Sequence, residues 1–251
     1  MNKQYIGAAL TAIISLSAIA AQQTSAQGIR INGGSVRISP QAAIACQGSL
    51  NNEAGLVTNN GSLGISDSLV NSGTIGGDGL CTVGGDWINR GTFDRGSGIV
   101  IFSGTAPQSI AAPYLTIFND LVISAASAGT TIEPGAMVTV AGSVFNTNGK
   151  LTVSSSGPDN SGSLIYSGTG MPAGDIIYIR SMPSGTYYSY VSSPVAGTAL
   201  PVTAQFWAWD EPSGDWGDPV VTSSGATGYT VRTNGQPLVF TGPLVTSFNK
   251  T

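Results

Sequence analysis

Histidine is absent from this chain of 251 residues, and charged side chains are scarce. Without histidine, the commonest general base and metal ligand is missing from any hydrolase or metalloenzyme mechanism. Charged residues make up 9% of the sequence, against about 25% in an ordinary globular domain. The formal net charge of -4 also lacks the basic excess that nucleic-acid binding requires. The composition therefore predicts a protein that is not an enzyme, has no cofactor and has no nucleic-acid partner.

Long apolar runs are rare too, and the one that stands out lies near the N-terminus. Lys3 precedes an apolar, small-residue segment from Tyr5 to Ala21, followed by two possible cleavage sites, the second before Gln27. This arrangement is typical of a secretory signal peptide, because the segment is short for a membrane span of roughly 20 residues. We expect residues 1–26 to be removed. The mature protein is then secreted or held at the cell surface, with no membrane span.

The chain is rich in glycine, with 35 residues, and it contains a repeated pattern. Four stretches align with one another: Ile44 to Val57, Leu63 to Ile75, Cys81 to Phe93 and Val138 to Leu151. Each has apolar residues at alternating positions, then an asparagine, a glycine and a last apolar residue. Alternation of period two is typical of strands with one buried face, and its recurrence at a short spacing indicates a solenoid. The pattern predicts a parallel β-helix over residues 27–153, right-handed like nearly all parallel crossovers.

One asparagine occupies the same column of every copy. These residues are Asn52, Asn71, Asn89 and Asn146. Stacked coils bring equivalent side chains about 4.8 Å apart, so we expect the amides to form a hydrogen-bonded ladder. Contact with a ligand is the alternative, but asparagine is also common at turns because it tolerates left-handed backbone.

The two cysteines, Cys46 and Cys81, both fall in inward apolar columns of the repeat. A whole coil separates them, which places them about 10 Å apart, whereas a disulfide needs Cα atoms within about 7 Å. Two cysteines in an exported protein would ordinarily suggest a bridge. Here the spacing predicts two buried free thiols.

The composition changes after residue 153. Residues 154–173 are rich in Gly, Ser and Pro and are predicted to be a linker, whereas 174–251 hold most of the aromatic residues in alternating runs separated by turns. This spacing predicts a small antiparallel β-sandwich, so the whole mature chain is expected to be all-β. A strand-like run stands close to Thr251, which is consistent with a fragment of a longer protein.

Three tryptophans of this C-terminal region are candidate ligand contacts: Trp207, Trp209 and Trp216. Tryptophan and tyrosine offer flat apolar faces with a polar handle, which suit stacking against sugar rings. The alternative is that these side chains fill the core of the sandwich. Trp207 and Trp209 lie two residues apart on one sheet face, so we expect both to be buried or both exposed, and exposure favours a sugar platform.

Four acidic residues are interleaved with the tryptophans: Asp210, Glu211, Asp215 and Asp218. Clustered carboxylates are the ligands that Ca²⁺ prefers, so they form a weak candidate calcium site. Their spacing lacks the order of a known calcium loop, and Pro212-Ser213-Gly214 is typical of a turn between two strands. The tip of a hairpin is the favoured interpretation.

Two regions carry a resemblance to known proteins. The first comprises Gly98 to Gly104 (GIVIFSG), Gln108 to Ile110 (QSI) and Phe118 to Ile123 (FNDLVI). The second includes Tyr188 to Val195 (YSYVSSPV) and Trp207 to Glu211 (WAWDE). Together they resemble secreted, repeat-rich surface proteins of Bacteroidota-type bacteria over most of the mature chain. This resemblance implies an adhesin-like role and export through a type IX route, although the sorting domain of such proteins is not found in these 251 residues.

These observations predict an exported bacterial cell-surface protein, adhesin-like and structural, without catalytic activity. The alternative is a carbohydrate-binding module that uses the C-terminal aromatic residues. A polysaccharide lyase or hydrolase built on a β-helix ranks third, because the basic residues of the repeat region, such as Arg90 and Arg95, are scattered instead of clustered with acids. The expected partner is an extracellular glycan or another surface or matrix component.

Overall fold

A computed structural model gives the fold. It describes residues 4–6, 11–13, 27–146, 151–169, 172–184, 188–196, 200, 204–222, 227–233 and 235–246. Every regular element within these residues is a β-strand, so the predicted all-β class is confirmed. The predicted signal peptide, residues 1–26, lies for the most part outside them. Over the described ranges, no helix has the length and apolar character needed to cross a membrane.

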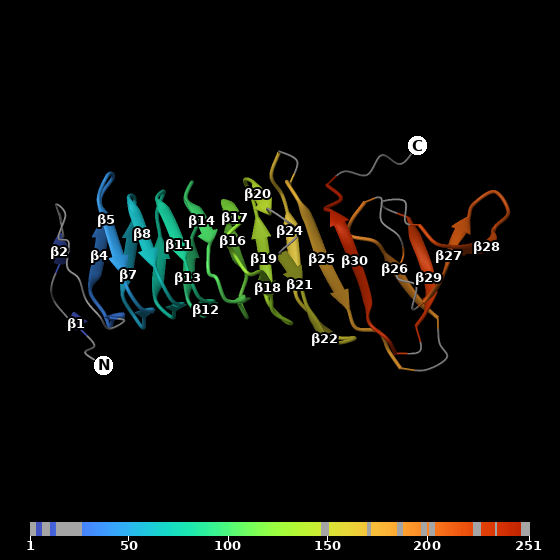
Figure 1. The fold of residues 1–251 in the computed structure, drawn as a ribbon, viewed down its shortest axis with the longest axis horizontal. Coiled ribbons are helices and arrows are strands. Elements are labelled where there is room, and N and C mark those ends of the chain that lie inside the picture. Colours follow the sequence, from blue (N-terminus) through green and yellow to red (C-terminus); the bar gives the residue numbers. More distant parts are fainter. Residues whose placement is uncertain are drawn as a thin grey trace.

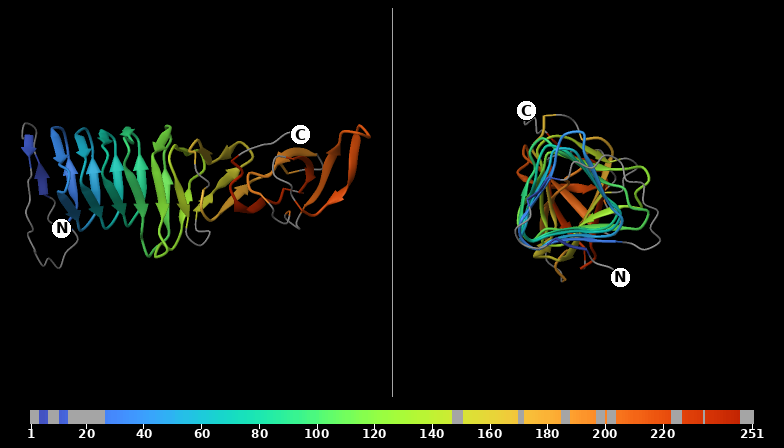
Figure 2. Two further views of the ribbon diagram at one scale, coloured as in Figure 1. Left: turned by 90° about the horizontal axis from the view of Figure 1, so that it is seen from above. Right: turned by 90° about the vertical axis from the view of Figure 1, so that its left-hand side faces the viewer.

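The larger part of the molecule is a parallel β-solenoid with three faces, which gives a triangular outline when viewed along its axis (Figures 1 and 2). The first face is a 10-stranded sheet. In order, its strands are β1 (Gln4–Ile6), β3 (Ile29–Ile31), β6 (Leu50–Asn52), β9 (Leu69–Asn71), β12 (Trp87–Asn89), β15 (Gln108–Ala111), β18 (Thr130–Ile132), β21 (Leu151–Val153), β25 (Asp175–Arg180) and β30 (Leu238–Pro243). All neighbouring pairs are parallel except β25 with β30.

The second face is a 6-stranded parallel sheet. Its strands are β5 (Ala43–Cys46), β8 (Ser62–Ile65), β11 (Leu80–Val83), β14 (Ile99–Phe102), β17 (Asp120–Ile123) and β20 (Val144–Asn146).

The third face is built by two sheets in succession. The first has β2 (Thr11–Ile13), β4 (Ser35–Ile38), β7 (Leu56–Asn59), β10 (Thr74–Gly76) and β13 (Thr92–Asp94), and the second has β16 (Thr116–Phe118), β19 (Met137–Val140) and β24 (Ser163–Tyr166). The strands β13 and β16 contact each other where one sheet gives way to the next.

The solenoid core is formed by the inward side chain of every second residue. Strand neighbours such as Leu50, Leu69 and Trp87 stack directly, since equivalent residues are paired between coils. Trp87 also packs edge-on against Phe93 and Phe118, with ring centroids 4.9 and 5.3 Å apart. A single coil cannot enclose its own apolar face, so the stack as a whole supplies the stability.

The fourth copy of the repeated pattern is out of phase with the first three. Those three begin on the second face and place their asparagines on the first face, whereas the fourth begins on the third face with β19. Asn146 therefore ends β20 on the second face, paired in register with Ile123. The prediction that Asn146 shares a column with Asn52, Asn71 and Asn89 is wrong. All three faces obey the same inward alternation, so the sequence does not distinguish a shift by one face.

Parallel stacking continues through the segment predicted as a linker. Residues 154–173 contain the hairpin of β22 (Ser155–Gly157) and β23 (Asn160–Ser161), and then β24, which extends the third face. After them, β25 pairs in parallel with β21 and in antiparallel with β30. This strand thereby joins the solenoid to the C-terminal part of the chain.

The C-terminal part contains a four-stranded antiparallel sheet in the order β26 (Ser189–Ser192), β29 (Gly228–Arg232), β27 (Gln205–Asp210) and β28 (Asp215–Val220). Its buried side chains form a second core with those of β30 and of the connecting segments: Met182, Val195, Leu200, Phe206, Tyr229, Val231, Leu238 and Phe240. The arrangement is sandwich-like, as predicted. Figure 1 places this sheet at the end of the molecule farthest from the N-terminus.

Candidate functional site

The four-stranded sheet turns one aromatic set inward and another outward. Phe206 and Tyr229 are buried in the second core. Trp207 follows Phe206 and so projects from the opposite face, because successive side chains alternate along a strand. In register with Trp207 lie Thr230 of β29 and, on the next strand, Tyr190. The outer face therefore carries a row of side chains that crosses three strands.

The aromatic rings on this outer face contact one another. Tyr188 meets Trp207 with ring centroids 5.5 Å apart, and Trp209 meets Trp216 at 5.3 Å, both nearly edge-on. Tyr190 lies 5.9 Å from Trp216 at an interplanar angle of 34°. Edge-on packing fixes the ring orientations while leaving ring faces open to other molecules. Tyr190 is 79% exposed and Trp209 is 46% exposed.

These rings enclose a groove of about 340 Å³. We call it the aromatic groove. It is lined by Tyr188, Tyr190, Trp207, Trp216, Gly217 and Thr230. Thr230 forms a buried floor, and Gly217 leaves space because it has no side chain. Two of the three predicted tryptophans line the groove. Trp209 lies next to it, where its indole Nε1 donates a hydrogen bond of 2.7 Å to Glu211 Oε2.

The four acidic candidates lie at the tip of the β27–β28 hairpin and its second strand. Asp210 and Asp215 are paired across the strands, and Gly214 adopts a positive φ of 64° in the turn between them. All four carboxylates are exposed. Among the residues with described positions, no three His, Cys, Asp or Glu side chains are grouped so as to hold a metal ion. The acids border one end of the outer face.

The asparagines of the first three copies of the repeat form a continuous ladder inside the solenoid. Asn52 Nδ2 donates to Asn71 Oδ1 at 2.8 Å, and Asn71 Nδ2 donates to Asn89 Oδ1 at 2.8 Å. The ladder ends where Asn89 Nδ2 donates to the hydroxyl of Thr116 at 2.9 Å. Each of these asparagines is 1% exposed. Their amides are fully engaged in the core and cannot reach a ligand.

Both cysteines are buried and free. Cys46 is in register with Ile65, and Cys81 with Leu63, so the two thiols occupy different columns as well as different coils. Burial raises the pKa of Cys81 to about 12. Because the thiolate is the reactive form of cysteine, this thiol is inert at neutral pH. Cys46 is buried as well, at 3% exposure.

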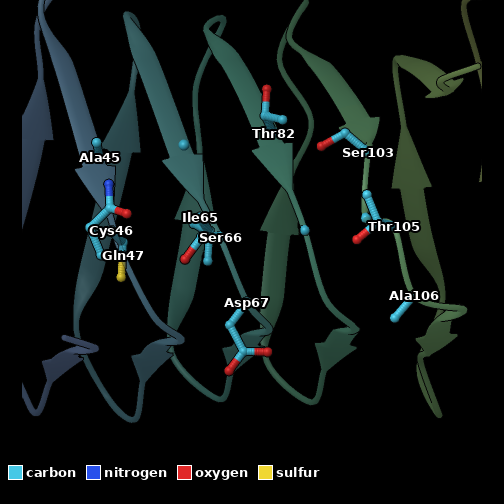
Figure 3. A pocket seen from close by; sticks show the side chains of 13 residues that line it. Ala45, Cys46, Gln47, Ile65, Ser66, Asp67, Thr82, Ser103, Thr105 and Ala106 are labelled. Atoms are coloured by element: carbon cyan, nitrogen blue, oxygen red, sulfur yellow. The ribbon is translucent and has the colours of Figure 1, made fainter. Parts of the chain in front are cut away.

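A second hollow, of about 640 Å³, lies on the outside of the solenoid where its second face meets its first (Figure 3). Small outward residues of β5, β8 and β11, such as Ala45, Gly64 and Thr82, form its base. One wall is the connection from β14 to β15, residues 103–107, which is longer than the preceding corner at 84–86. Sequence analysis did not find this hollow, because its members come from four coils and carry no distinctive motif.

The side chain of Gln108 holds the longer corner in place. Its Oε1 accepts a hydrogen bond from Gly104 N at 2.8 Å, and its Nε2 donates to the carbonyls of Val83 and Gly85 at 3.0 and 2.6 Å. The lining of the hollow offers few groups that could bind a ligand. Its one charged lining residue, Asp67, already accepts a hydrogen bond from Ser49 Oγ at 2.8 Å. No aromatic ring lines the hollow. The aromatic groove is therefore the better candidate for a ligand-binding site.

No protein-family model, curated protein or solved structure matches this chain. The fold and the site define its class as a parallel β-solenoid that carries an aromatic groove on a C-terminal antiparallel sheet. Its function must therefore be inferred from the chemistry of that groove.

Proposed function

We propose that this protein is an exported, adhesin-like surface protein that binds extracellular glycans through the aromatic groove and has no catalytic activity. The outward position of Trp207 and Trp216 carries this proposal. The signal-like N-terminus and the resemblance to secreted, repeat-rich surface proteins of Bacteroidota-type bacteria support export. Trp209 is exposed but Trp207 is half-buried, so the expected joint exposure of these two tryptophans is met only in part, and the exposed rings of Tyr188 and Tyr190 add to the support for a sugar platform.

Trp207 and Trp216 are half-buried, so part of each apolar ring still faces water. Burial of apolar surface contributes about 25 cal/mol per Å², and the same sheet buries Phe206 and Tyr229 in the second core. A ligand that covers Trp207 and Trp216 would recover this term for the outward rings. A sugar ring fits, because its C–H faces stack on an aromatic ring while its hydroxyl groups remain hydrogen-bonded at the edge.

Polar groups around the rings complete the match to a sugar. Glu211, which accepts a hydrogen bond from Trp209 Nε1, is exposed beside the groove and has a carboxylate that can also accept hydrogen bonds from hydroxyl groups. The residues that line the groove include no carboxylate, lysine or cysteine, and the sequence has no histidine. A groove of this composition binds a ligand without supplying a general acid and base pair to cleave it.

The test is a glycan array followed by titration calorimetry on the best binder. We expect Trp207→Ala and Trp216→Ala each to weaken binding by about tenfold, which corresponds to 1.4 kcal/mol. Tyr114→Ala is the matched control, because Tyr114 is an aromatic side chain 64% exposed on the solenoid. It should leave the affinity unchanged.

Two results would overturn the proposal. The first is an array without selective binding by the intact protein. The second is a ligand whose affinity is the same for the tryptophan variants and for Tyr114→Ala. Release of new reducing ends from the bound glycan would separately refute the absence of catalysis.

A further inference from the structure

Arg232 extends the outer face beyond the aromatic groove. It is the last residue of β29 and stands two residues after Thr230. Tyr229 and Val231 are buried in the second core, so alternation along the strand places Thr230 and Arg232 together on the opposite face. The guanidinium therefore belongs to the same surface as the aromatic rings.

The neighbours of Arg232 place it at one end of the groove. Gln205, the first residue of β27, is paired with Arg232 across the strands. On the other side, Tyr188 directly precedes Ser189, which is the partner of Val231. Tyr188 lines the groove. Arg232 thus lies beside the ring that closes this end.

One donor of the Arg232 guanidinium is left without a partner among the described residues. Its Nε atom is buried, and no hydrogen-bond acceptor among the described residues reaches it. Burial of an N–H group without an acceptor is unfavourable. A guanidinium has five N–H donors in a planar fork that matches a carboxylate. A guanidinium at the edge of a binding groove, with its Nε donor unpaired, is suited to an anionic group on the ligand.

The opposite end of the groove has the opposite charge. Strand β27 runs from Gln205, beside Arg232, to Asp210, which faces Asp215 at the hairpin tip. At about 3.3 Å per residue, the two ends are roughly 17 Å apart. An anion is attracted to the Arg232 end and repelled from the acidic end. This difference in charge along the strand sets a direction for a charged ligand.

We propose that the groove binds an acidic glycan, and that its carboxylate-bearing sugar ring lies at the Arg232 end. This inference rests on the proposed function, since it names the class of sugar that the same groove takes. The guanidinium donates a pair of hydrogen bonds to the carboxylate. Tyr188 and Trp207 offer ring faces for the sugar, and the acidic hairpin tip accepts hydrogen bonds from the neutral hydroxyls of the next rings.

The experiment compares each acidic oligosaccharide with its own methyl ester, which removes the charge and keeps the sugar. The probes are oligogalacturonate, hyaluronate oligosaccharides and sialyllactose, and binding is measured by calorimetry on the full chain. We expect at least one acid to bind about tenfold or more tightly than its ester. In Arg232→Gln the acid should fall to the affinity of the ester, while the ester changes less than twofold.

Two further variants are measured: Arg232→Lys, which tests the guanidinium geometry, and Arg37→Gln, which is the control. The lysine keeps the charge but loses the fork, so part of the preference should remain. Arg37 is exposed on the solenoid, far along the chain from the groove, and its substitution should change nothing. If Arg232→Gln fails to fold, raised salt on the intact protein should weaken the acid and leave the ester unaffected.

The outcomes separate this inference from the proposed function. Equal affinity of acids and esters would overturn the acidic-glycan inference while glycan binding stands. Equal losses for acid and ester in Arg232→Gln, with a lowered melting temperature, would show a purely structural arginine and overturn it too. Absence of binding to every glycan would overturn the proposed function, and this inference with it.

Discussion

The asparagine ladder makes a prediction whose size can be worked out from its contacts. Asn71 is its middle member. It accepts a hydrogen bond from Asn52 and donates one to Asn89 and one to the carbonyl of Thr92. The substitution Asn71→Ala removes all three and leaves a small space in a buried column.

The partners of Asn71 set the magnitude of the loss. Asn52 Nδ2 keeps its hydrogen bonds to the carbonyls of Gly55 and Thr74, and Asn89 Oδ1 keeps the one from Gly91 N. No ladder partner is left entirely unpaired. A net contribution of about 1 kcal/mol per hydrogen bond then gives a loss of about 3 kcal/mol. For a chain of this length, that loss lowers the melting temperature by about 6–12 °C.

Thermal melting followed by circular dichroism measures this loss. Asn51→Ala is the matched control: Asn51 is the neighbouring asparagine on β6 and points outward, away from Asn52. Its substitution should change stability by no more than about 0.5 kcal/mol. If Asn71→Ala melts within 2 °C of Asn51→Ala, a margin of about 1 kcal/mol, the ladder does not stabilise the stack and the reasoning fails.

An isosteric substitution adds a test of the donor role. In Asn71→Asp, an ionised carboxylate cannot donate to Asn89 or Thr92, and burial raises its folded pKa above about 3.9, the value in the unfolded chain. The unfolded chain then ionises first as pH rises, so the variant loses stability above pH 4. We expect Asn71→Asp to be much closer to the parent at pH 4 than at pH 7. Equal destabilisation at both values would contradict this.

Three further predictions concern the solenoid. In Gly73→Ala the new Cβ would overlap the carbonyl of Gly55, which should cost about 1–3 kcal/mol; Gly64→Ala, whose Cβ meets no atom closer than 3.9 Å, should melt like the parent. Iodoacetamide should label neither Cys46 nor Cys81 in the native protein but both in the unfolded, non-reduced protein, and a mass without adducts would indicate a disulfide. Because burial raises the pKa of Cys81 to about 12, the unfolded thiol ionises first, near about 8.5. Stability should therefore fall as pH rises from about 9 to 12, and less steeply in Cys81→Ala, as urea titrations at each pH would show.

The solenoid could largely be predicted from sequence because its geometry has so few free parameters. Strand side chains alternate with period two, and stacked coils repeat the same columns. Leu63 and Ile65 of β8 and Cys81 and Val83 of β11 accordingly face inward where the alternation places them. The same two facts predicted that Asn52, Asn71 and Asn89 stack in one column.

The places where prediction failed are those where alternation alone does not decide. Asn146 has the right neighbours in sequence but lies one face away, because a coil can begin on any face. The longer corner at 103–107 and the parallel pairing of β25 depend on how far the chain travels between strands. The pattern of apolar residues in the sequence does not indicate how far the chain travels between strands.

The aromatic groove shows a different limit. Alternation predicts that Phe206 and Trp207 face opposite ways, but not which of them meets the core. Packing against Leu238 and Phe240 of β30 decides, since the second core takes Phe206. Arg232 was not recognised at all as a site residue. Its position beside Tyr188 depends on the strand order of the antiparallel sheet, which nothing in the sequence specifies.

Uniform register between coils gives the molecule an adjustable length. Ser62 is paired with Leu80 and also with Ala43, so removal of residues 62–79 would let β5 pair directly with β11. The rod would shorten by one strand spacing, about 4.8 Å, and its triangular section would stay the same. The groove lies at the end away from the N-terminus (Figure 1). Gain or loss of whole coils would therefore change how far the protein reaches without changing what it recognises.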